Sequence, residues 1–273
     1  MPQTAPKAVT QWTIQPFITG CFTVVDIGVV SFRWGRAAGG RVQPFMLPTC
    51  QVWSLFMSRF RNRARATGYR IGGEWIRRTW EWACRVAAIG PNDASGKRFG
   101  KFGAGSIILF PHNTIFNEHY IHIGEGTMIG KDATLSAGMV PGQKCLSDPV
   151  VRIGDRCLIG KGSGIVGHFS IDIGDDVWTG HHVYITDQNH GYEDITKPIS
   201  QQTQPEQGVV IGNGSWLGFG SVVLPGARIG EHVTIGANSV VTGEIPSYSV
   251  AVGAPARVIR RYVEGEGWVR PGR

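Results

Sequence analysis

One histidine, His190, stands at the head of an irregular polar stretch where it could carry chemistry. The stretch ITDQNHGYEDITKPISQQTQPEQGVV, residues 185–210, separates two tracts in which an aliphatic residue followed by glycine returns every six residues. Histidine titrates near neutral pH and can therefore take a proton from a hydroxyl group. The stretch is longer than a tight corner needs, which is typical of functional loops. From these residues alone, a merely solvated loop histidine remains the alternative.

The elements that must position His190 are repeats of six residues. They begin at 123, 129, 135, 153 and 159 and, after the interruption, at 211, 217, 223, 229, 235 and 241. A period of six fits neither an amphipathic helix nor a simple alternating strand. We expect the aliphatic first residue to point inward and the small fifth residue to leave room at a bend, as at Thr127, Ala133, Ser215 and Ser239. Stacked repeats of this kind share one apolar core.

Three tracts resemble the hexapeptide-repeat acyltransferases: IGDDVWTGHHVYITDQNH, IGNGSWLGFGSVVLPGARIGEHVTIGANSVV and SVAVGAPARVIRR. The resemblance covers residues 105–261 and is strongest to the maltose and galactoside O-acetyltransferases and their polysaccharide-modifying relatives. It implies a mainly β protein, a left-handed parallel β-helix. The hand rests on the resemblance, since general crossover rules favour the opposite one. The resemblance also implies a homotrimer whose active sites are shared between subunits.

The same resemblance implies the chemistry. In the family one histidine, 17 residues after an isoleucine of a repeat, acts as general base, and Ile173 plus 17 is His190. The reaction implied is direct transfer of an acyl group, most simply acetyl, from acyl-CoA to a hydroxyl of a sugar or glycoconjugate. Acyl-CoA would be a co-substrate, and no tightly bound cofactor or metal is expected.

The resemblance assigns further residues to the two substrates. Trp216 would stack along the pantetheine arm of CoA, and backbone amides at Gly218 or Phe219 and at Ala237 would bind that arm. Arg257 and Arg260 would lie near the nucleotide phosphates, where a cation compensates fixed negative charge. Acceptor contacts are expected from His168, Asn189, Tyr192 and Asp187.

Three positions depart from the family pattern. Gly243 replaces a lysine that contacts phosphate, and Gly160 and His168 replace an asparagine and an aspartate that contact the acceptor in the galactoside enzymes. The acceptor pocket is therefore expected to differ from that of galactoside or maltose enzymes.

Other functions fit less of the sequence. An antibiotic acetyltransferase also has Asn-His before its loop, and a non-enzymatic β-helix scaffold is the alternative from another class. A β-helical zinc carbonic anhydrase would need two histidines five positions apart, and none of the eight histidines form such a pair. The serine acetyltransferases share a helical N-terminal part, but their aspartate–histidine region has no counterpart here.

The basic charge of the chain belongs to an N-terminal arm. Residues 1–98 hold 14 Lys and Arg against 4 Asp and Glu, whereas residues 99–273 hold 13 against 16. We expect two helices in the arm, at about 51–66 and 74–89, the second capped by Gly90 and Pro91, and leave residues 1–50 unassigned. A β-helix domain over 99–262 and a tail over 263–273 would follow. The arm either packs on that domain with its arginines in water or forms a basic patch on anionic lipid.

The location expected is the cytoplasm, with peripheral contact at the inner face of the membrane as the further option. Five scattered cysteines favour a reducing compartment, and neither a secretion signal nor a membrane span is recognisable. Nucleic acid is not an expected partner, because no known binding module appears.

Overall fold

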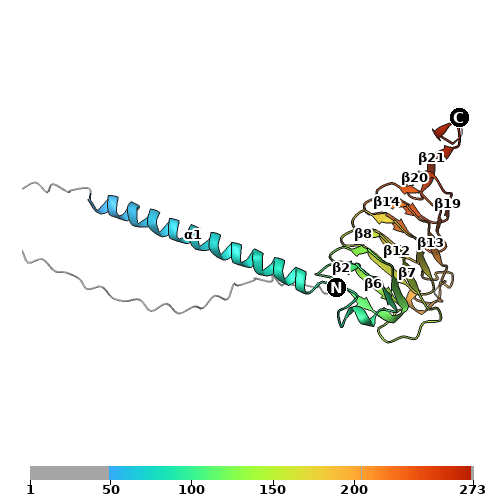
Figure 1. The fold of residues 1–273 in the computed structure, drawn as a ribbon, viewed down its shortest axis with the longest axis horizontal. Helices are drawn as coiled ribbons and strands as arrows, with labels where there is room; N and C mark the ends of the chain where they lie inside the picture. The colour runs from blue at the N-terminus through green and yellow to red at the C-terminus, as the bar shows by residue number, and fades with distance from the viewer. Residues whose placement is uncertain (1–48, 204, 272–273) are drawn as a thin grey trace, which may run out of the picture. The chain divides into compact units, whose positions relative to one another are not determined.

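The computed structural model describes residues 49–203 and 205–271, and the strands between Lys101 and Val252 form a left-handed parallel β-helix (Figure 1). The fold class predicted from the repeats is thus confirmed. Contacts divide the chain into two units, Met1–Arg59 and Phe60–Arg273, and every contact discussed below lies within the second unit.

Each coil of the β-helix visits three sheets in turn. The first sheet contains β1 (Lys101–Phe102), β4 (Ile121–Ile123), β7 (Val151–Ile153), β10 (Ile171–Ile173), β13 (Val209–Ile211), β16 (Arg228–Ile229) and β19 (Glu244–Ile245). The second contains β2 (Ile107–Ile108), β5 (Met128–Ile129), β8 (Leu158–Ile159), β11 (Trp178–Thr179), β14 (Trp216–Leu217), β17 (Thr234–Ile235), β20 (Ser249–Val252), β21 (Arg257–Val263) and β22 (Gly267–Val269). The third contains β3 (Ile115–Phe116), β6 (Thr134–Ala137), β9 (Gly164–Gly167), β12 (Tyr184–Thr186), β15 (Val222–Val223) and β18 (Val240–Val241). Pairing between coils is parallel, and β21 and β22 turn back as antiparallel strands after the last coil.

The first residue of each repeat builds the core, as the sequence predicts. Ile123, Ile173 and Ile211 are at most 1% exposed and stack along the inside of the first sheet. Burying an isoleucine side chain contributes roughly 1.5–3 kcal/mol to the free energy of folding. The repetition of this one contact over seven coils therefore stabilises the scaffold that carries the loops.

The small fifth residues of the repeats are buried at the bends, and some also tie neighbouring coils together. The Thr127 hydroxyl donates a 2.7 Å hydrogen bond to the carbonyl of Gly154, and the Ser215 hydroxyl donates a 3.0 Å bond to that of Gly230. These hydroxyls satisfy backbone groups that a corner would otherwise leave unpaired.

Two of the three corners of the coil are regular. Between the first and second sheets, each coil has one residue with positive φ: Gly105, Gly126, Arg156, Asp176, Gly214, His232 and Tyr248. Side chains support this corner from coil to coil, as where Asp175 Oδ1 accepts the amide of Asp155 at 2.9 Å. Between the second and third sheets, Asp132, Gly162, His182, Gly220 and Asn238 repeat the same conformation.

The third corner, between the third and first sheets, is irregular. Its connections are the turn with η2 (Glu118–Tyr120), the loop 138–150, the short turn 168–170, the long loop 187–208, which contains η3 (Ile199–Gln201), and the short turns 224–227 and 242–243. The two long loops thus flank a turn of three residues on successive coils. The interruption of the six-residue period predicted the loop after His190. The loop 138–150 was not predicted, because the repeats on either side of it begin 18 residues apart, at 135 and 153, and keep the period.

The arm contains one helix, α1 (Thr49–Val86), where the sequence indicated two. The gap was expected around Gly68, Gly72 and Gly73, but none of these glycines has a positive φ. A glycine within a helix costs about 1 kcal/mol without breaking its hydrogen bonds, so the helix continues through them. It ends four residues before Gly90, whose amide instead donates to Asp93 Oδ2, and η1 (Gly96–Arg98) follows. The predicted cap at Gly90 was therefore wrong.

Within the residues that the structure describes, none of the helices has the length and hydropathy of a membrane span. Of residues 1–50, which the sequence left unassigned, residues 1–48 lie outside the described residues, and Thr49 and Cys50 begin α1. The predicted domain limits stay predictions.

Candidate active site

His190 lies on a loop whose two arms are paired as an antiparallel ribbon. The amide of Gln207 donates to the carbonyl of Asp187 at 2.8 Å, that of Asn189 to Pro205 at 3.2 Å, and that of Gly191 to Thr203 at 2.9 Å. The same register includes a bridge between Gln188 and Glu206. The loop that leaves the third sheet after β12 thus folds back on itself. The paired arms, which we call the ribbon, fix the backbone on either side of His190.

The tip of this ribbon is closed by side chains. Gln202 accepts the amide of Asp194 at 3.1 Å and donates to its carbonyl at 2.9 Å. Asp194 also accepts the Thr196 hydroxyl and pairs with Lys197 at 3.0 Å. The hydrogen bond from Thr196, followed by that from Lys197, lowers the pKa of Asp194 below its usual value. The carboxylate therefore stays ionised and keeps the tip closed at neutral pH.

The residues around His190 face solvent. His190 and Asn189 are exposed, the amide of His190 donates to Asn189 Oδ1 at 2.9 Å, and the Tyr192 side chain is 71% exposed. The backbone pairing ends at Gly191, so Asn189, His190 and Tyr192 lie near the outer end of the paired arms, away from the base at Asp187.

Asp187 has a different place from the one predicted. Its side chain is fully buried, and its carboxylate accepts the amides of His168 and Phe169 at 2.8 Å and that of Ser170 at 2.6 Å. A carboxylate with both oxygens engaged in this way does not reach an acceptor in solvent. The structure instead makes Asp187 the residue that joins the base of the ribbon to the turn of the preceding coil.

His168 lies beneath the ribbon rather than on an open surface. Its side chain is 6% exposed, and Nδ1 is 3.9 Å from Glu206 Oε1 on the returning arm. Burial lowers the pKa of His168, while the charges of Asp187 and Glu206 act in the opposite direction. The predicted contact between His168 and the acceptor stays a prediction, and it would require the acceptor to enter between the loops.

The loop 138–150 is the second long loop at the corner between the third and first sheets. Asn117 holds it by donating to the carbonyls of Ala137 and Val140 and accepting the amide of Gly142 at 2.7 Å. Its Met139 lies 4.0 Å from Gln188 Nε2, so the two long loops meet. Cys145 of this loop is partly buried, and desolvation, followed by the charge of Glu206, raises the pKa of its thiol.

The residues expected to bind CoA lie mainly along the second sheet. Trp216 is aligned with Thr234, Thr234 with Val250, and Val250 with Arg260, so these residues form one row on four neighbouring strands. Three strand spacings separate the exposed Trp216 ring from the exposed Arg260, a distance of about 14 Å. Arg257 lies further along β21, also exposed.

The amides expected to bind the same arm lie at the corner beside this row. Gly218 donates its amide to the carbonyl of Ile235 at 2.8 Å, so the protein already uses it. Within the described residues, the amides of Phe219 and Ala237 have no such partner, and both residues are exposed. Of the two neighbouring amides considered from the sequence, the structure therefore favours Phe219.

The two groups of predicted residues do not come together within one chain. His190 leaves the corner between the third and first sheets, whereas Trp216 and Arg260 lie on the second sheet. In a three-sided coil, that corner and that sheet are opposite each other. A site that uses both groups thus requires a second copy of the chain.

Trp178 was missed from the sequence. It is aligned with Trp216 on the neighbouring strand and is 55% exposed, against 45% for Trp216. The signal was present, because the two tryptophans end the repeats IGDDVW and IGNGSW at the same position. The row of exposed side chains on the second sheet thus begins one coil earlier than predicted.

Among the residues with described positions, no three His, Cys, Asp or Glu side chains gather as they would around a metal ion.

Comparison with known proteins agrees with this fold. Residues 208–243 match the family described as bacterial transferase hexapeptide (six repeats), and residues 150–186 match the hexapeptide repeat of succinyl-transferase. An Escherichia coli protein named for lipopolysaccharide biosynthesis O-acetyl transfer is 36% identical over 163 residues, which cover 57% of this chain and 79% of that protein. The chain belongs to the hexapeptide-repeat transferase family.

Other relatives match over shorter stretches. The galactoside O-acetyltransferase of Lactococcus lactis is 36% identical over 130 residues, covering 40% of this chain and 62% of that enzyme. A Mycobacterium tuberculosis relative named as an acetyltransferase is 36% identical over 140 residues, or 51% of this chain, and the match spans only 44% of the relative's length.

Among solved structures, an N-acyltransferase from Bacillus cereus in complex with dTDP and 3-hydroxybutyryl-CoA superposes with a TM-score of 0.52 at 21% identity. The match covers 63% of this chain and 87% of that one. At this level of identity the likeness shows the fold alone.

Proposed function

We propose that the protein is an acyl-CoA-dependent O-acyltransferase that transfers an acyl group, most simply acetyl, to a hydroxyl of a sugar or glycoconjugate. The observation that carries the proposal is the exposed His190 on a ribbon fixed at its base and tip. The names of the relatives, which include a lipopolysaccharide O-acetyl transferase and galactoside O-acetyltransferases, support this choice of reaction.

In the proposed reaction His190 acts as general base. Its imidazole removes the proton of the acceptor hydroxyl while the oxygen attacks the thioester carbonyl, and a tetrahedral intermediate forms. The C–S bond then breaks, and the CoA sulfur leaves with the proton that the imidazolium returns. Atoms and charge balance without a covalent enzyme intermediate. General base catalysis of this kind contributes roughly 10²- to 10⁴-fold to the rate.

The donor would lie along the second sheet of a neighbouring subunit. Trp216 would cover the pantetheine arm, the amides of Phe219 and Ala237 would donate to it, and Arg257 and Arg260 would face the phosphates. The row from Trp216 to Arg260 supports this placement, because it puts an aromatic ring and a cation on one outward face. Since His190 comes from a different corner, the proposal requires a homotrimer with sites between subunits.

The acceptor would lie against the ribbon. Asn189 and Tyr192 would contact it directly and His168 from beneath, with Asp187 in a positioning role only. Reaction with acyl-CoA would take place in the cytoplasm. We also propose that the basic arm makes a peripheral contact with a membrane, which would bring the site to acceptors carried on lipids.

Thermal unfolding with CoA and acetyl-CoA tests the donor site. A ligand at 100 times its dissociation constant adds about 2.7 kcal/mol to the stability of the folded state. We expect this shift in wild type and its loss in Trp216→Ala. The control is Trp82→Ala, which removes an exposed tryptophan ring from α1, outside the row on the second sheet, and should keep the shift.

The outcomes separate an enzyme from a scaffold. A shift that Trp216→Ala abolishes would justify screening sugar acceptors by release of free CoA thiol. An unchanged unfolding temperature at millimolar acetyl-CoA would overturn the proposed function and favour a non-enzymatic β-helix.

A further inference from the structure

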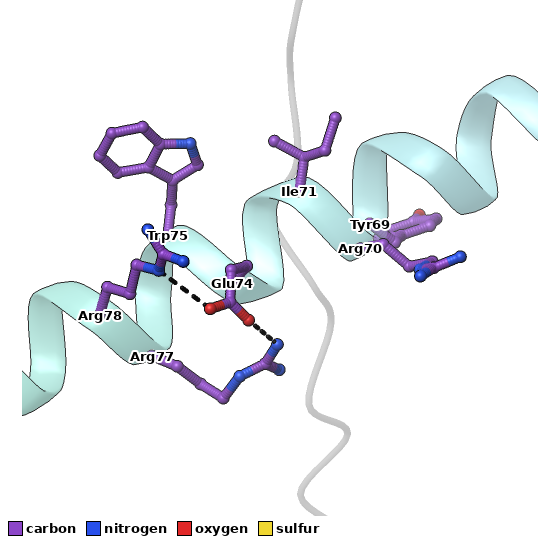
Figure 2. A pocket seen from close by; sticks show the side chains of 7 residues that line it. All are labelled: Tyr69, Arg70, Ile71, Glu74, Trp75, Arg77 and Arg78. Atoms are coloured by element: carbon purple, nitrogen blue, oxygen red, sulfur yellow. Dashed lines mark hydrogen bonds and ion pairs between the residues drawn. The ribbon is translucent and has the colours of Figure 1, made fainter.

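The exposed surface of α1 presents apolar side chains that the β-helix does not cover. Ile71, Trp75, Trp82 and Val86 are 56%, 69%, 59% and 61% exposed. At 3.6 residues per turn, their spacing of four, seven and four residues places them within an arc of about 60°. We call these four residues the apolar stripe. Figure 2 shows Ile71 and Trp75 projecting to one side of the helix, and Arg77 to another.

The helix meets the β-helix with a different face. The Trp80 ring lies 6.1 Å from that of Phe110, between centroids, and Cys84 Sγ is 3.7 Å from Lys131 Nζ. Both positions lie on the side of α1 opposite the apolar stripe. The sequence left open whether the arm packs on the β-helix or forms a lipid-binding patch. Trp80 makes a contact with the β-helix, whereas Trp75, Ile76 and Val86 are exposed.

Positive charge borders the apolar stripe. Arg78 and Arg85 lie next to one edge of the apolar stripe. Arg70 and Arg77 lie further from the same edge around the helix. Residues 68–86 contain four arginines against two glutamates. Glu74 is held by Arg77 and Arg78, whose hydrogen bonds lower the pKa of its carboxyl (Figure 2). Residues 68–86 thus have a net charge of +2 beside a stripe with two tryptophans.

We infer that the apolar stripe of α1 rests on a membrane that contains anionic phospholipids, with the helix axis parallel to the membrane surface. Tryptophan favours the boundary between acyl chains and headgroups, because its ring is apolar and its N–H is polar. Arginines beside such a stripe reach lipid phosphates, each contributing about a fivefold gain in binding. A helix with these two features lies in the interface and does not cross it.

Two other occupants fit the charges less well. A second copy of α1 in a coiled coil would need apolar residues at positions 78 and 85, three residues after Trp75 and Trp82, and both are arginine. Residues 1–48 hold four Lys and Arg against one acidic residue, so their charge has the same sign as that of the helix. An anionic lipid surface is the occupant whose charge is complementary.

Vesicle flotation of the full chain tests the inference without relying on catalysis. We expect the wild-type protein to float with vesicles of phosphatidylcholine and phosphatidylglycerol, and not with phosphatidylcholine alone. The double variant Trp75→Ser/Trp82→Ser should lose at least about tenfold in affinity, and Arg78→Gln/Arg85→Gln a similar factor. Trp80→Ser is the matched control on the opposite face and should bind as wild type does.

Three results would overturn the inference. The wild-type protein could fail to float with anionic vesicles, or Trp80→Ser could weaken flotation as much as the double variant does. The third is a change in particle mass by light scattering when Trp75 and Trp82 are replaced, which would assign the stripe to self-association. Circular dichroism would check that each variant keeps its helix. Binding of acetyl-CoA is measured separately, so failure here would remove the proposed membrane contact of the arm and leave the proposed acyl transfer untouched.

Discussion

The corner between the third and first sheets differs from the other two corners of the same coil. At the regular corners each coil turns within a few residues, with one residue in the left-handed region and hydrogen bonds that repeat from coil to coil. At the irregular corner the chain makes connections of very different length, of which 138–150 and 187–208 are the longest. At the regular corners the side chains repeat the same support from coil to coil, whereas at the irregular corner each long loop has its own hydrogen bonds. His190 and its ribbon occur at the irregular corner.

The largest effect expected from this difference concerns histidines at the two kinds of corner. Replacing His190 by Ala should lower the rate of acyl transfer by about 10²- to 10⁴-fold with little change in unfolding temperature, because the side chain is exposed. His232→Asn is the control at a regular corner, where asparagine tolerates the observed φ of 54°. It should leave the rate near that of wild type. Initial rates of acyl transfer to one acceptor would compare the two variants. An equal loss of rate in both would show that the irregular corner has no special role in catalysis.

A smaller effect is expected from the aspartates that support each kind of corner. Asp187→Ala removes a buried carboxylate and leaves the amides of residues 168–170 without partners, which should cost about 3–5 kcal/mol of unfolding free energy. Asp175→Ala removes one hydrogen bond to the amide of Asp155 and should cost about 0.5–1.5 kcal/mol. Urea denaturation measures both. If the two costs are equal, the ribbon is not anchored through Asp187.

A further difference is expected between glycines inside and outside the ribbon. A methyl group on Gly191 would lie 2.4 Å from the carbonyl oxygen of Thr203, so Gly191→Ala must push the two arms apart. Overpacking of this kind costs about 1–3 kcal/mol, and we expect the rate of transfer to fall about tenfold as His190 shifts. Gly243→Ala, where nothing lies within 4 Å of the added methyl, should have no effect on rate or stability. A Gly191→Ala enzyme with the wild-type rate would show that the ribbon does not position the base.

The scaffold could be predicted from the sequence because each repeat has an aliphatic residue and a small residue at fixed positions. The buried isoleucines and the small residues at the bends follow a fixed period, and stacking leaves them one arrangement. The row of Trp178 and Trp216 could have been found in the same way, from their common position in the repeat.

The ribbon could not be predicted in this way, because its pairing depends on backbone hydrogen bonds between arms with no alternating pattern. The burial of Asp187 could not be predicted either, because an aspartate in a polar loop is ordinarily expected to face solvent. The single helix α1 was missed because three glycines resemble a break, although a glycine in helical conformation only weakens a helix.

The smallest effect expected at the irregular corner is a dependence of stability on pH. Burial lowers the pKa of His168 below the value near 6.5 of an unfolded chain, while Asp187 and Glu206 oppose the shift. Between the lowered pKa and 6.5 the unfolded chain binds more protons than the folded one, so the free energy of unfolding falls as pH drops through this window. The stability that neutral His168 contributes is fully present above the window. Glu206→Gln removes one of the opposing charges and should lower the pKa of His168 further, which increases the loss of stability as pH falls below 6.5. Urea midpoints of wild type and Glu206→Gln across this range measure the difference, in which the other histidines cancel. Parallel curves would show that Glu206, across the ribbon, does not act on His168.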